Sequence, residues 1–421
     1  MTKFKNIVVI GLGYIGLPTA AMFASSGIKV LGVDVNHEVV DTINKGDIHI
    51  VENGLKQLVS EVVNSGNLLA STSPSTADAF VISVPTPLLN NKTSTMPEPD
   101  LRFIYEAIKS ISKYLKPGNL IVLESTSPVG TTEKMADWIS KFRPDLILPE
   151  KDQNRGLESI SIAYCPERVL PGNIINELIH NDRVIGGITT NCGLLAEDLY
   201  KVFLKGDCTI TDSKTAEMVK LTENSSRDVQ IAFANELSLI CDENGIDVLN
   251  LIKIANKHPR VNILKPGAGV GGHCIAVDPW FIVHKNPNHA NLIKTAREVN
   301  NSKPIWVIKK VDELLENYFN KNPNKDRADI KICCYGLSFK PDIDDLRESP
   351  ALFITRELAK KYRNNVFAIE PNIEYLEGED FELVEFPPAG TLISLILVNH
   401  SDFHNKTIKS DILLDLHGIV L

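Results

Sequence analysis

Three glycines near the amino terminus constrain the fold more than any other feature of the sequence. They are Gly11, Gly13 and Gly16. A short apolar run, Ile7–Ile10, precedes them, and a helix-like segment follows. In a strand–turn–helix unit the first glycine permits a tight turn, the second lets the backbone approach a pyrophosphate, and the third lets the helix pack on the strand. The pattern therefore predicts an α/β unit that binds a dinucleotide.

The dinucleotide that this unit prefers is indicated by Asp34, which ends the next apolar run. A carboxylate there accepts hydrogen bonds from the adenosine ribose hydroxyls and repels a 2′-phosphate, so NAD is expected rather than NADP. The helix start offers free N–H groups and a positive dipole end to the phosphates. Tyr14 and Ile15, which lie in this turn, are therefore further candidate cofactor contacts.

Composition excludes several classes of protein. The 421 residues suggest two or three domains, and a net charge of −9 argues against nucleic acid as a partner, because phosphate binding needs a basic face. The seven cysteines lack metal-site spacing, so we expect free thiols in a reducing compartment and no bound metal. No apolar run approaches the roughly 18 residues of a membrane span, and we expect a cytoplasmic protein.

Several apolar runs predict the strands of a parallel sheet. Their hydrophobicity is continuous rather than alternating, which suits strands buried on both faces, and helix-like segments separate some of them. The runs are Ile7–Ile10, Lys29–Asp34, Phe80–Val84, Leu120–Leu123 and Val184–Ile188. This alternation predicts an amino-terminal Rossmann domain, a doubly wound α/β sheet, over residues 1–205.

The middle of the chain has a helical pattern. From Ser213 to about Asn244 apolar residues recur at helical spacing without Pro or Gly. Ser213 before Glu217 gives a helix start and Gly245 a natural stop. We expect a central helical dimerisation domain with one long helix over residues 206–319.

A second, smaller α/β domain is predicted over residues 320–421. The polar stretch Asn320–Arg327 reads as a linker into it, and vicinal Cys333 and Cys334 are expected to pack within its first strand. The predicted strands are Ile330–Gly336, Val366–Glu370 and Leu392–Val398. The first of them is followed by a segment without the glycine trio, so this Rossmann-like domain should bind something other than a dinucleotide.

A glycine-rich loop at residues 267–272 leads to Cys274. Backbone N–H groups crowded around a cysteine favour the thiolate and can stabilise an oxyanion. A small residue in a tight turn is the simpler interpretation of the loop taken alone. Lys220, Asn224 and Arg227 are spaced to share one helix face, which could equally be a solvated polar stripe.

Seven longer motifs occur in order along the chain. They are GLGYIGLPTA, ESTSPVG, AYCPERVLPG, AEMVKLTEN, ANKHPRVNI, GVGGHCIAVDPWF and GLSFKPDIDDLRESP. Through them the sequence resembles the UDP-glucose/UDP-mannose dehydrogenase family, and within it the UDP-N-acetyl-D-mannosamine dehydrogenases. The resemblance runs from the first glycine motif to about His400.

The resemblance implies covalent chemistry on Cys274. In the family the matching cysteine attacks the C6 aldehyde that the first hydride transfer produces. The thiohemiacetal loses a second hydride to become a thioester, which water hydrolyses, so one substrate consumes two NAD. Lys220 and Asn224 match residues of proton transfer or oxyanion stabilisation. Glu167 and Thr126 match residues that handle the water or proton in later steps, and Asp278 matches one that orients the Cys–Lys pair.

The resemblance also implies contacts with a UDP-sugar, NAD and a second subunit. Thr86, Thr126 and Arg347 match cofactor contacts. His258 and Arg260 match residues that reach the substrate across the interface of a homodimer. The residues that match substrate contacts in the same subunit are Arg168, Val169, Lys220, Asn224, Arg227, Gly271, Phe339 and Lys340.

We therefore expect an NAD-dependent oxidation of UDP-N-acetyl-D-mannosamine to the uronate, feeding cell-surface polysaccharide synthesis, with the active site in a cleft between the domains. The nearest alternative is the same chemistry on UDP-N-acetylglucosamine, UDP-N-acetylgalactosamine or UDP-glucose. A two-electron hydroxyacid dehydrogenase, which would not need Cys274, is more distant. A non-enzymatic NAD-binding interaction protein is the remaining alternative.

Overall fold

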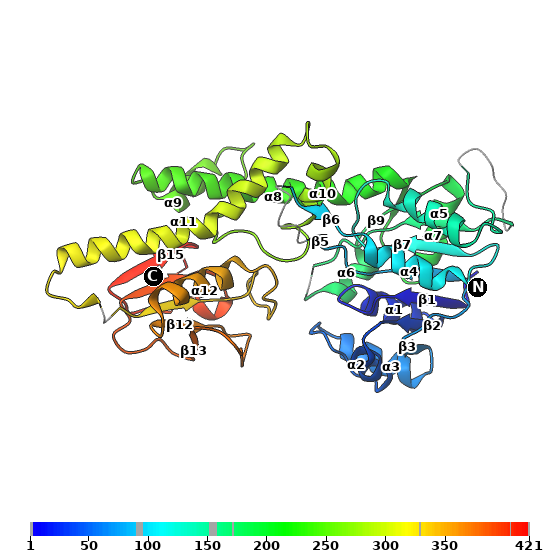
Figure 1. The fold of residues 1–421 in the computed structure, drawn as a ribbon, viewed down its shortest axis with the longest axis horizontal. Coiled ribbons are helices and arrows are strands. Elements are labelled where there is room, and N and C mark those ends of the chain that lie inside the picture. Colours follow the sequence, from blue (N-terminus) through cyan, green and yellow to red (C-terminus); the bar gives the residue numbers. More distant parts are fainter. Residues whose placement is uncertain are drawn as a thin grey trace. The chain divides into compact units, whose positions relative to one another are not determined.

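The computed structural model describes residues 3–89, 96–150, 158–170, 172–327, 330–404 and 406–419. The chain divides into two compact units, each shown in Figure 1. Unit 1 comprises Met1–Glu223 and Trp280–Lys285, and unit 2 comprises Asn224–Pro279 and Asn286–Leu421. The boundaries of the three domains expected from the sequence stay a prediction.

Unit 1 is built on a sheet whose strands run in the order β10-β9-β8-β7-β4-β1-β2-β3. The strands are β1 (Asn6–Ile10), β2 (Lys29–Val33), β3 (Leu68–Ser71), β4 (Ala79–Ile82), β7 (Leu120–Leu123), β8 (Ser161–Tyr164), β9 (Arg183–Gly187) and β10 (Cys208–Asp212). Neighbouring strands are parallel except β8 and β9, which are antiparallel. The doubly wound α/β fold is confirmed. Within its mostly parallel sheet, β9 runs antiparallel to β8, because it returns from the edge where β8 ends.

Helices cover both faces of this sheet (Figure 1). Alternate strand residues separate the two cores: Val9 and Val81 pack on one face, while Val8 and Phe80 pack on the other. The first face carries α1 (Gly16–Ser25), α2 (His37–Asn44), α3 (Leu55–Asn64), α6 (Ile174–His180) and α7 (Thr190–Tyr200). The second carries α4 (Arg102–Ser112) and α5 (Thr131–Phe142). A short antiparallel pair, β5 (Leu88–Leu89) and β6 (Glu98–Pro99), stands apart from the sheet.

The long helix α8 (Ser213–Glu243) has almost the bounds that the sequence predicts. Glu217, however, does not cap the start of α8. The Glu217 carboxylate is buried and accepts hydrogen bonds from the Gly130 N–H at 2.5 Å and from the N–H and hydroxyl of Thr132 at 2.8 and 2.6 Å. It therefore caps α5, which begins with a left-handed Gly130 and without a side-chain cap of its own.

Unit 2 combines helices with a second sheet. Its remaining helices are α9 (Val248–Ala255), α11 (Asn291–Lys321), α12 (Pro350–Tyr362), the 3-10 turn η3 (Ser401–Phe403) and the start of α10 (Asp278–Lys285). Because α11 extends to Lys321, the first two residues of the predicted linker are helical. None of the helices in the described ranges is long and apolar enough to cross a membrane.

The sheet of unit 2 has the order β13-β12-β11-β14-β15, and its neighbouring strands are parallel. Its strands are β11 (Ile332–Tyr335), β12 (Val366–Ile369), β13 (Glu382–Leu383), β14 (Ile393–Ile396) and β15 (Ile412–Asp415). On β11, Cys334 packs on the face covered by α11 and α12, while Cys333 packs on the other face with Phe403. Both thiols are free and buried, and burial raises the pKa of each.

Candidate functional site

In the glycine loop of unit 1, a side chain would clash with the backbone at two glycine positions and would find free space at the third. A Cβ atom on Gly16 would lie 1.8 Å from the Gly11 carbonyl oxygen, and one on Gly11, whose φ is +89°, would lie 2.5 Å from the Ser83 carbonyl oxygen. A Cβ atom on Gly13 would meet nothing within 4 Å. Space above Gly13 is what close approach of a pyrophosphate requires, so the loop fits a dinucleotide.

Asp34, at the end of β2, forms a hydrogen bond with the backbone of this loop. Its carboxylate accepts hydrogen bonds from the Leu12 N–H at 2.9 Å and the Asn36 N–H at 3.0 Å. The sequence predicted a ribose contact for Asp34 but not this second role in the loop. Tyr14 and Ile15 are half-buried in the turn before α1, which starts without a side-chain cap or an acidic residue in its first turn. The helix start can therefore receive an anion.

Two threonines predicted to contact the cofactor lie together at the carboxyl edge of the sheet. The Thr86 hydroxyl donates to the Thr126 carbonyl oxygen at 2.6 Å. Thr86 follows β4 and Thr126 follows β7, and these strands are neighbours. Ligands of open α/β sheets bind outside this edge.

Glu167 follows β8 at the same edge and is buried, with 8% of its surface exposed. One carboxylate oxygen accepts from Arg183 Nη2 at 2.8 Å, and the other from the Arg168 N–H at 2.7 Å. The Arg168 guanidinium pairs with both carboxylate oxygens of Glu223, at 2.6 and 3.1 Å. Val169 is half-buried against the core of unit 1.

Sequence reasoning missed Arg183 and Glu124, which are both buried in this region. Glu124 comes directly after the fully buried strand β7 within the motif ESTSPVG, and Arg183 is the first residue of buried β9. A charged residue bordering a continuous apolar run is the signal that could have found them.

The predicted trio on α8 differs in exposure along the helix. The Lys220 side chain is buried, and its ammonium makes no hydrogen bond or ion pair with any residue in the described ranges. Asn224 is half-buried, and its Nδ2 donates to Asp278 Oδ2 at 2.5 Å. Arg227 is exposed. The polar stripe is therefore not a uniformly solvated face.

Cys274 lies in a turn that leads into α10, and its side chain is exposed. Its carbonyl oxygen accepts from the N–H groups of Val277 and Asp278 at 3.1 and 2.8 Å. The preceding glycines approach another segment of unit 2. A Cβ atom on Gly271 would lie 2.4 Å from the Glu348 carbonyl oxygen and 2.8 Å from Phe339 Cβ.

The cysteine loop is thereby joined to the motif GLSFKPDIDDLRESP. The Gly272 N–H donates to the Arg347 carbonyl oxygen at 3.1 Å, and a Cβ atom on Gly272 would lie 2.7 Å from the Phe339 ring. The Arg347 guanidinium pairs with Asp345; burial raises the pKa of that carboxyl, but the hydrogen bonds from Arg347 outweigh this and lower it. Lys340 is half-buried beside Phe339. Gly271, Cys274, Phe339 and Arg347 thus belong to one region.

Buried polar groups on α8 and α11 support this loop, and sequence reasoning missed them. Asn235 Oδ1 accepts from the Gly267 N–H at 3.0 Å. Arg297, with 2% of its surface exposed, pairs with Asp228 at 2.6 Å and reaches the Ile275 carbonyl oxygen at 3.5 Å.

His258 and Arg260 are exposed on the loop after α9. Asn256 holds this loop, because its side chain exchanges two hydrogen bonds with the backbone of Ile263, at 2.9 and 2.7 Å.

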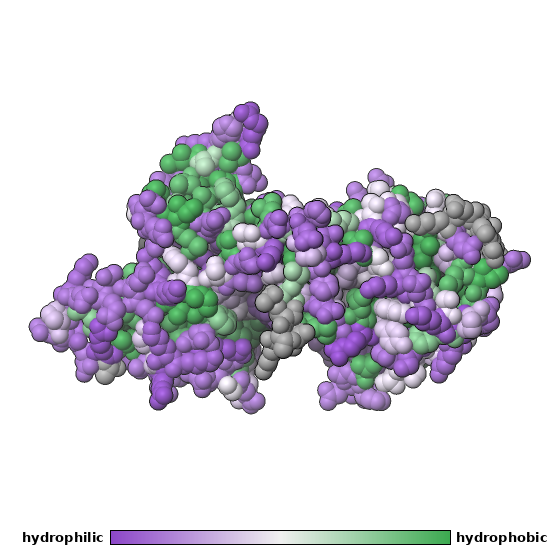
Figure 2. Space-filling model, turned by 45° about the horizontal axis from the view of Figure 1, so that its top comes forward, coloured by the Kyte–Doolittle hydropathy of each residue, from purple (hydrophilic) through white to green (hydrophobic). Residues whose placement is uncertain are grey.

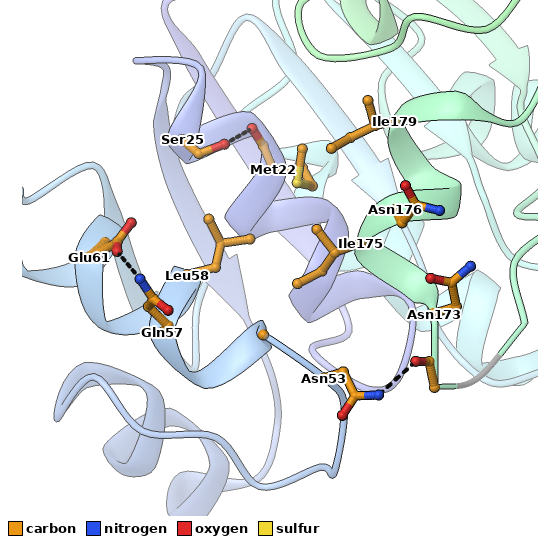
Figure 3. A pocket seen from close by; sticks show the side chains of 12 residues that line it. Met22, Ser25, Asn53, Gln57, Leu58, Glu61, Asn173, Ile175, Asn176 and Ile179 are labelled. Atoms are coloured by element: carbon orange, nitrogen blue, oxygen red, sulfur yellow. Dashed lines mark hydrogen bonds between the residues drawn. The ribbon is translucent and has the colours of Figure 1, made fainter.

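A groove of about 600 Å³ on unit 1 lies apart from these residues, between α1, α3 and α6 (Figure 3). Apolar side chains, including Met22, Leu58 and Ile175, meet several side-chain amides there. The Asn53 Nδ2 donates to the Gly172 carbonyl oxygen across it, at 3.0 Å. The groove contains none of the predicted site residues.

Comparison with known proteins matches each region to a described domain. The NAD binding domain of the UDP-glucose/GDP-mannose dehydrogenase family matches residues 5–204, its central domain residues 214–302, and its UDP binding domain residues 333–420. The chain belongs to this family. The family is described by UDP-glucose and GDP-mannose, whereas the resemblance inferred from the sequence named UDP-mannose in place of GDP-mannose. NAD as the cofactor is confirmed.

Individual relatives are similar over almost the whole chain. The UDP-N-acetyl-D-mannosamine dehydrogenase of Yersinia pestis is 53% identical over 99% of both chains. An NDP-N-acetyl-D-galactosaminuronic acid dehydrogenase of Ralstonia nicotianae is 50% identical over 99% of this chain and 96% of its own. The structure of a UDP-D-ManNAc dehydrogenase from Pyrococcus horikoshii superimposes with a TM-score of 0.86 at 36% identity, covering 99% of this chain and 96% of that one.

Proposed function

We propose that this chain oxidises UDP-N-acetyl-D-mannosamine at C6 to UDP-N-acetyl-D-mannosaminuronate, using two NAD and one water per substrate. The observation that carries the proposal is the 53% identity to a dehydrogenase of that substrate over 99% of the chain. The product serves cell-surface polysaccharide synthesis in the cytoplasm. When bound, NAD would supply the two-electron oxidant for each of the two oxidations, and the proton of the C6 hydroxyl group is released to water in the first.

Cys274 carries the covalent part of the reaction. Its thiolate adds to the C6 aldehyde, and the resulting thiohemiacetal is oxidised to a thioester. Lys220 stabilises the oxyanion at C6, a role suited to a buried ammonium with no ion pair among the described residues. Asn224 and Asp278, which hydrogen-bond to each other, orient the turn that bears Cys274.

Hydrolysis completes the reaction. A water oxygen bonds to the thioester carbon, the carbon–sulfur bond breaks, and the Cys274 thiolate leaves. Glu167 accepts the proton of this water, and Thr126 takes part in the same handling of water and proton. The Glu167 carboxylate is well suited to this because two hydrogen bonds fix its orientation.

The UDP-sugar is bound by local side chains, because the net charge of −9 disfavours an anion overall. The family's UDP binding domain matches residues 333–420, which include Phe339 and Lys340. Arg168, Val169, Arg227 and Gly271 complete the proposed substrate contacts, with Lys220 and Asn224. Thr86 and Arg347 join Gly11–Gly16 and Asp34 on the cofactor.

We also propose that the protein is a homodimer. Phe233 and Ile240 on α8 and Ile254 on α9 are 51%, 49% and 57% exposed. Figure 2 shows hydrophobic surface concentrated on the projecting part at the upper left, where α9 and the end of α8 lie. Apolar exposure on this scale favours a protein interface. His258 and Arg260 follow α9 and would reach the partner's substrate.

The second candidate is the same chemistry on UDP-N-acetylgalactosamine, favoured by the 50% identity to the Ralstonia enzyme. The test compares kcat/KM for UDP-N-acetylmannosamine, UDP-N-acetylgalactosamine, UDP-N-acetylglucosamine and UDP-glucose under one set of conditions. We expect the highest value for UDP-N-acetylmannosamine. Turnover of another UDP-hexose with none of this one would overturn the substrate, and bound NAD without NADH from any of them would indicate a non-enzymatic protein.

A further inference from the structure

A buried polar cluster lies beneath Glu167 in unit 1. The Arg183 guanidinium is at its centre, with 3% of the residue exposed. Its Nη2 is 2.8 Å from Glu167 Oε2, and its Nη1 is 3.8 Å from Glu124 Oε1 and 3.7 Å from Cys165 Sγ. The guanidinium also lies over the Tyr200 ring, 4.5 Å from the centroid. One buried guanidinium thus lies close to two buried carboxyl groups.

The direction of β9 explains why Arg183 meets Glu167. In the antiparallel pairing of β8 and β9, Ala163 is opposite Gly187 and Tyr164 is opposite Gly186. Continued beyond the strand, this register places Glu167 opposite Arg183. The first residue of β9 therefore lies at the edge where the parallel strands end. A parallel β9 would begin at the other edge of the sheet.

Glu124 ties the cluster to the elements beside the glycine loop. Its Oε2 accepts from the Ser83 hydroxyl at 2.6 Å, and its Oε1 accepts from Tyr200 at 3.2 Å and Thr19 at 3.4 Å. Burial raises the pKa of Glu124 to about 7, while the Arg183 charge opposes the rise. Burial also raises the pKa of the Cys165 thiol to about 12, so this neighbour contributes no anion at neutral pH.

We propose that Arg183 is a positioning residue for thioester hydrolysis, which holds the Glu167 carboxylate in the orientation that accepts a proton from water, with Glu124 bracing the guanidinium. This proposal rests on the proposed function. Glu167 has only two hydrogen bonds among the described residues, one from Arg183 and one from the Arg168 N–H. Without the guanidinium, the carboxylate keeps a single restraint and loses its neutralising partner.

The two oxidations and the hydrolysis should respond differently to the loss of Arg183. Both oxidations precede the attack of water, and neither uses Glu167 as proton acceptor. A variant of Arg183 should therefore form the thioester on Cys274 and hydrolyse it slowly. Because kcat/KM reports steps up to the formation of the thioester, kcat and KM should fall together while their ratio changes little.

The experiment uses the full-length protein with UDP-N-acetylmannosamine and NAD, quenched within the first turnovers. Intact-protein mass spectrometry measures the covalent adduct, and NADH absorbance measures the burst. For Arg183→Met we expect adduct on most sites, a burst of two NADH per site, and a kcat lowered about 100-fold. Arg183→Lys should recover part of the rate, and Glu167→Gln should reproduce the adduct.

The matched control is Arg143→Met, which removes a partly buried arginine of the same unit. The Arg143 guanidinium donates hydrogen bonds to the Ser112 and Leu115 carbonyl oxygens, and the Arg143→Met enzyme should accumulate no covalent adduct. If Arg183→Met melts below the assay temperature, the variants Arg183→Lys and Glu124→Gln, the second of which is isosteric, are measured in its place. If either of these two variants is folded and has wild-type kcat without adduct, the proposal is overturned. A folded Arg183 variant that lowers kcat/KM as much as kcat also overturns it. Failure of the proposed function is recognised separately, because wild type would then give no NADH from the UDP-sugar.

Discussion

The Asn224 side chain on α8 donates a hydrogen bond to the Asp278 carboxylate, with 2.5 Å between Nδ2 and Oδ2. Asp278 is the first residue of α10, and its own N–H donates to the Cys274 carbonyl oxygen at 2.8 Å. The turn that presents the cysteine is therefore fixed to the long helix through one carboxylate.

Loss of this link should affect the chemistry more than the fold. For Asn224→Ala we expect kcat to fall about 100-fold, because a fixed donor in an active site contributes on that order. The change in unfolding free energy should stay within roughly 1 kcal/mol for one lost hydrogen bond. Steady-state kinetics and urea unfolding measure the two effects. Gln230→Ala, elsewhere on α8, is the matched control, and an Asn224→Ala enzyme as active as this control would contradict the role.

Two glycines of the dinucleotide loop should respond differently to alanine. Gly13→Ala places a methyl group in open space, so the melting temperature should hold while the Kd for NAD rises about tenfold, or ~1.4 kcal/mol. Gly16→Ala places its Cβ 1.8 Å from the Gly11 carbonyl oxygen and should destabilise unit 1 itself. Calorimetric titration with NAD and thermal unfolding distinguish these results. Equal destabilisation by both changes would show that the loop is not open at Gly13.

Buried Lys303 on α11 should make stability depend on pH. Its ammonium donates to the Ser238 hydroxyl at 2.5 Å and lies 3.8 Å from the Trp306 ring centroid, and burial lowers its pKa to about 7, against the attraction of Asp242. The unfolded chain, with the usual lysine pKa of 10.5, then binds more protons than the folded chain between these two values. The unfolding free energy should therefore rise with pH above 7, by at most about 1.4 kcal/mol per pH unit.

The measurement is urea unfolding at several pH values for wild type and Lys303→Met. The variant lacks the titrating group, so its unfolding free energy should rise less steeply above pH 7. Lys309→Met, on the same helix, should keep the wild-type slope. Parallel pH profiles for wild type and Lys303→Met would contradict the assignment.

The sequence predicted those parts of the fold that local pattern determines. The strand–glycine–helix unit around Gly11–Gly16 and the long helix from Ser213 were found almost at their observed bounds, because periodicity and the absence of Pro and Gly are local signals. The antiparallel direction of β9 was not predicted, since strand direction depends on how the connection after β8 returns. Because the antiparallel direction of β9 brings Arg183 next to Glu167, this ion pair was also missed.

Site residues divide in the same way. Gly271 and Phe339 were named from separate motifs through the family resemblance, and the structure brings them together by a packing contact that no spacing in the sequence contains. Glu217 was read as part of a helix start, but its carboxylate caps α5, more than 80 residues away in sequence. Arg297 and Asp228 lie on buried faces of α11 and α8, and their pairing becomes visible only once the two helices are packed.

The most direct test of the account is the NADH released per UDP-N-acetylmannosamine consumed, with limiting substrate, for wild type and Cys274→Ala. Because the thioester requires the thiolate, we predict two NADH per sugar in wild type and loss of steady turnover in the variant. One NADH per sugar, or a Cys274→Ala enzyme with full turnover, would contradict the four-electron route through Cys274.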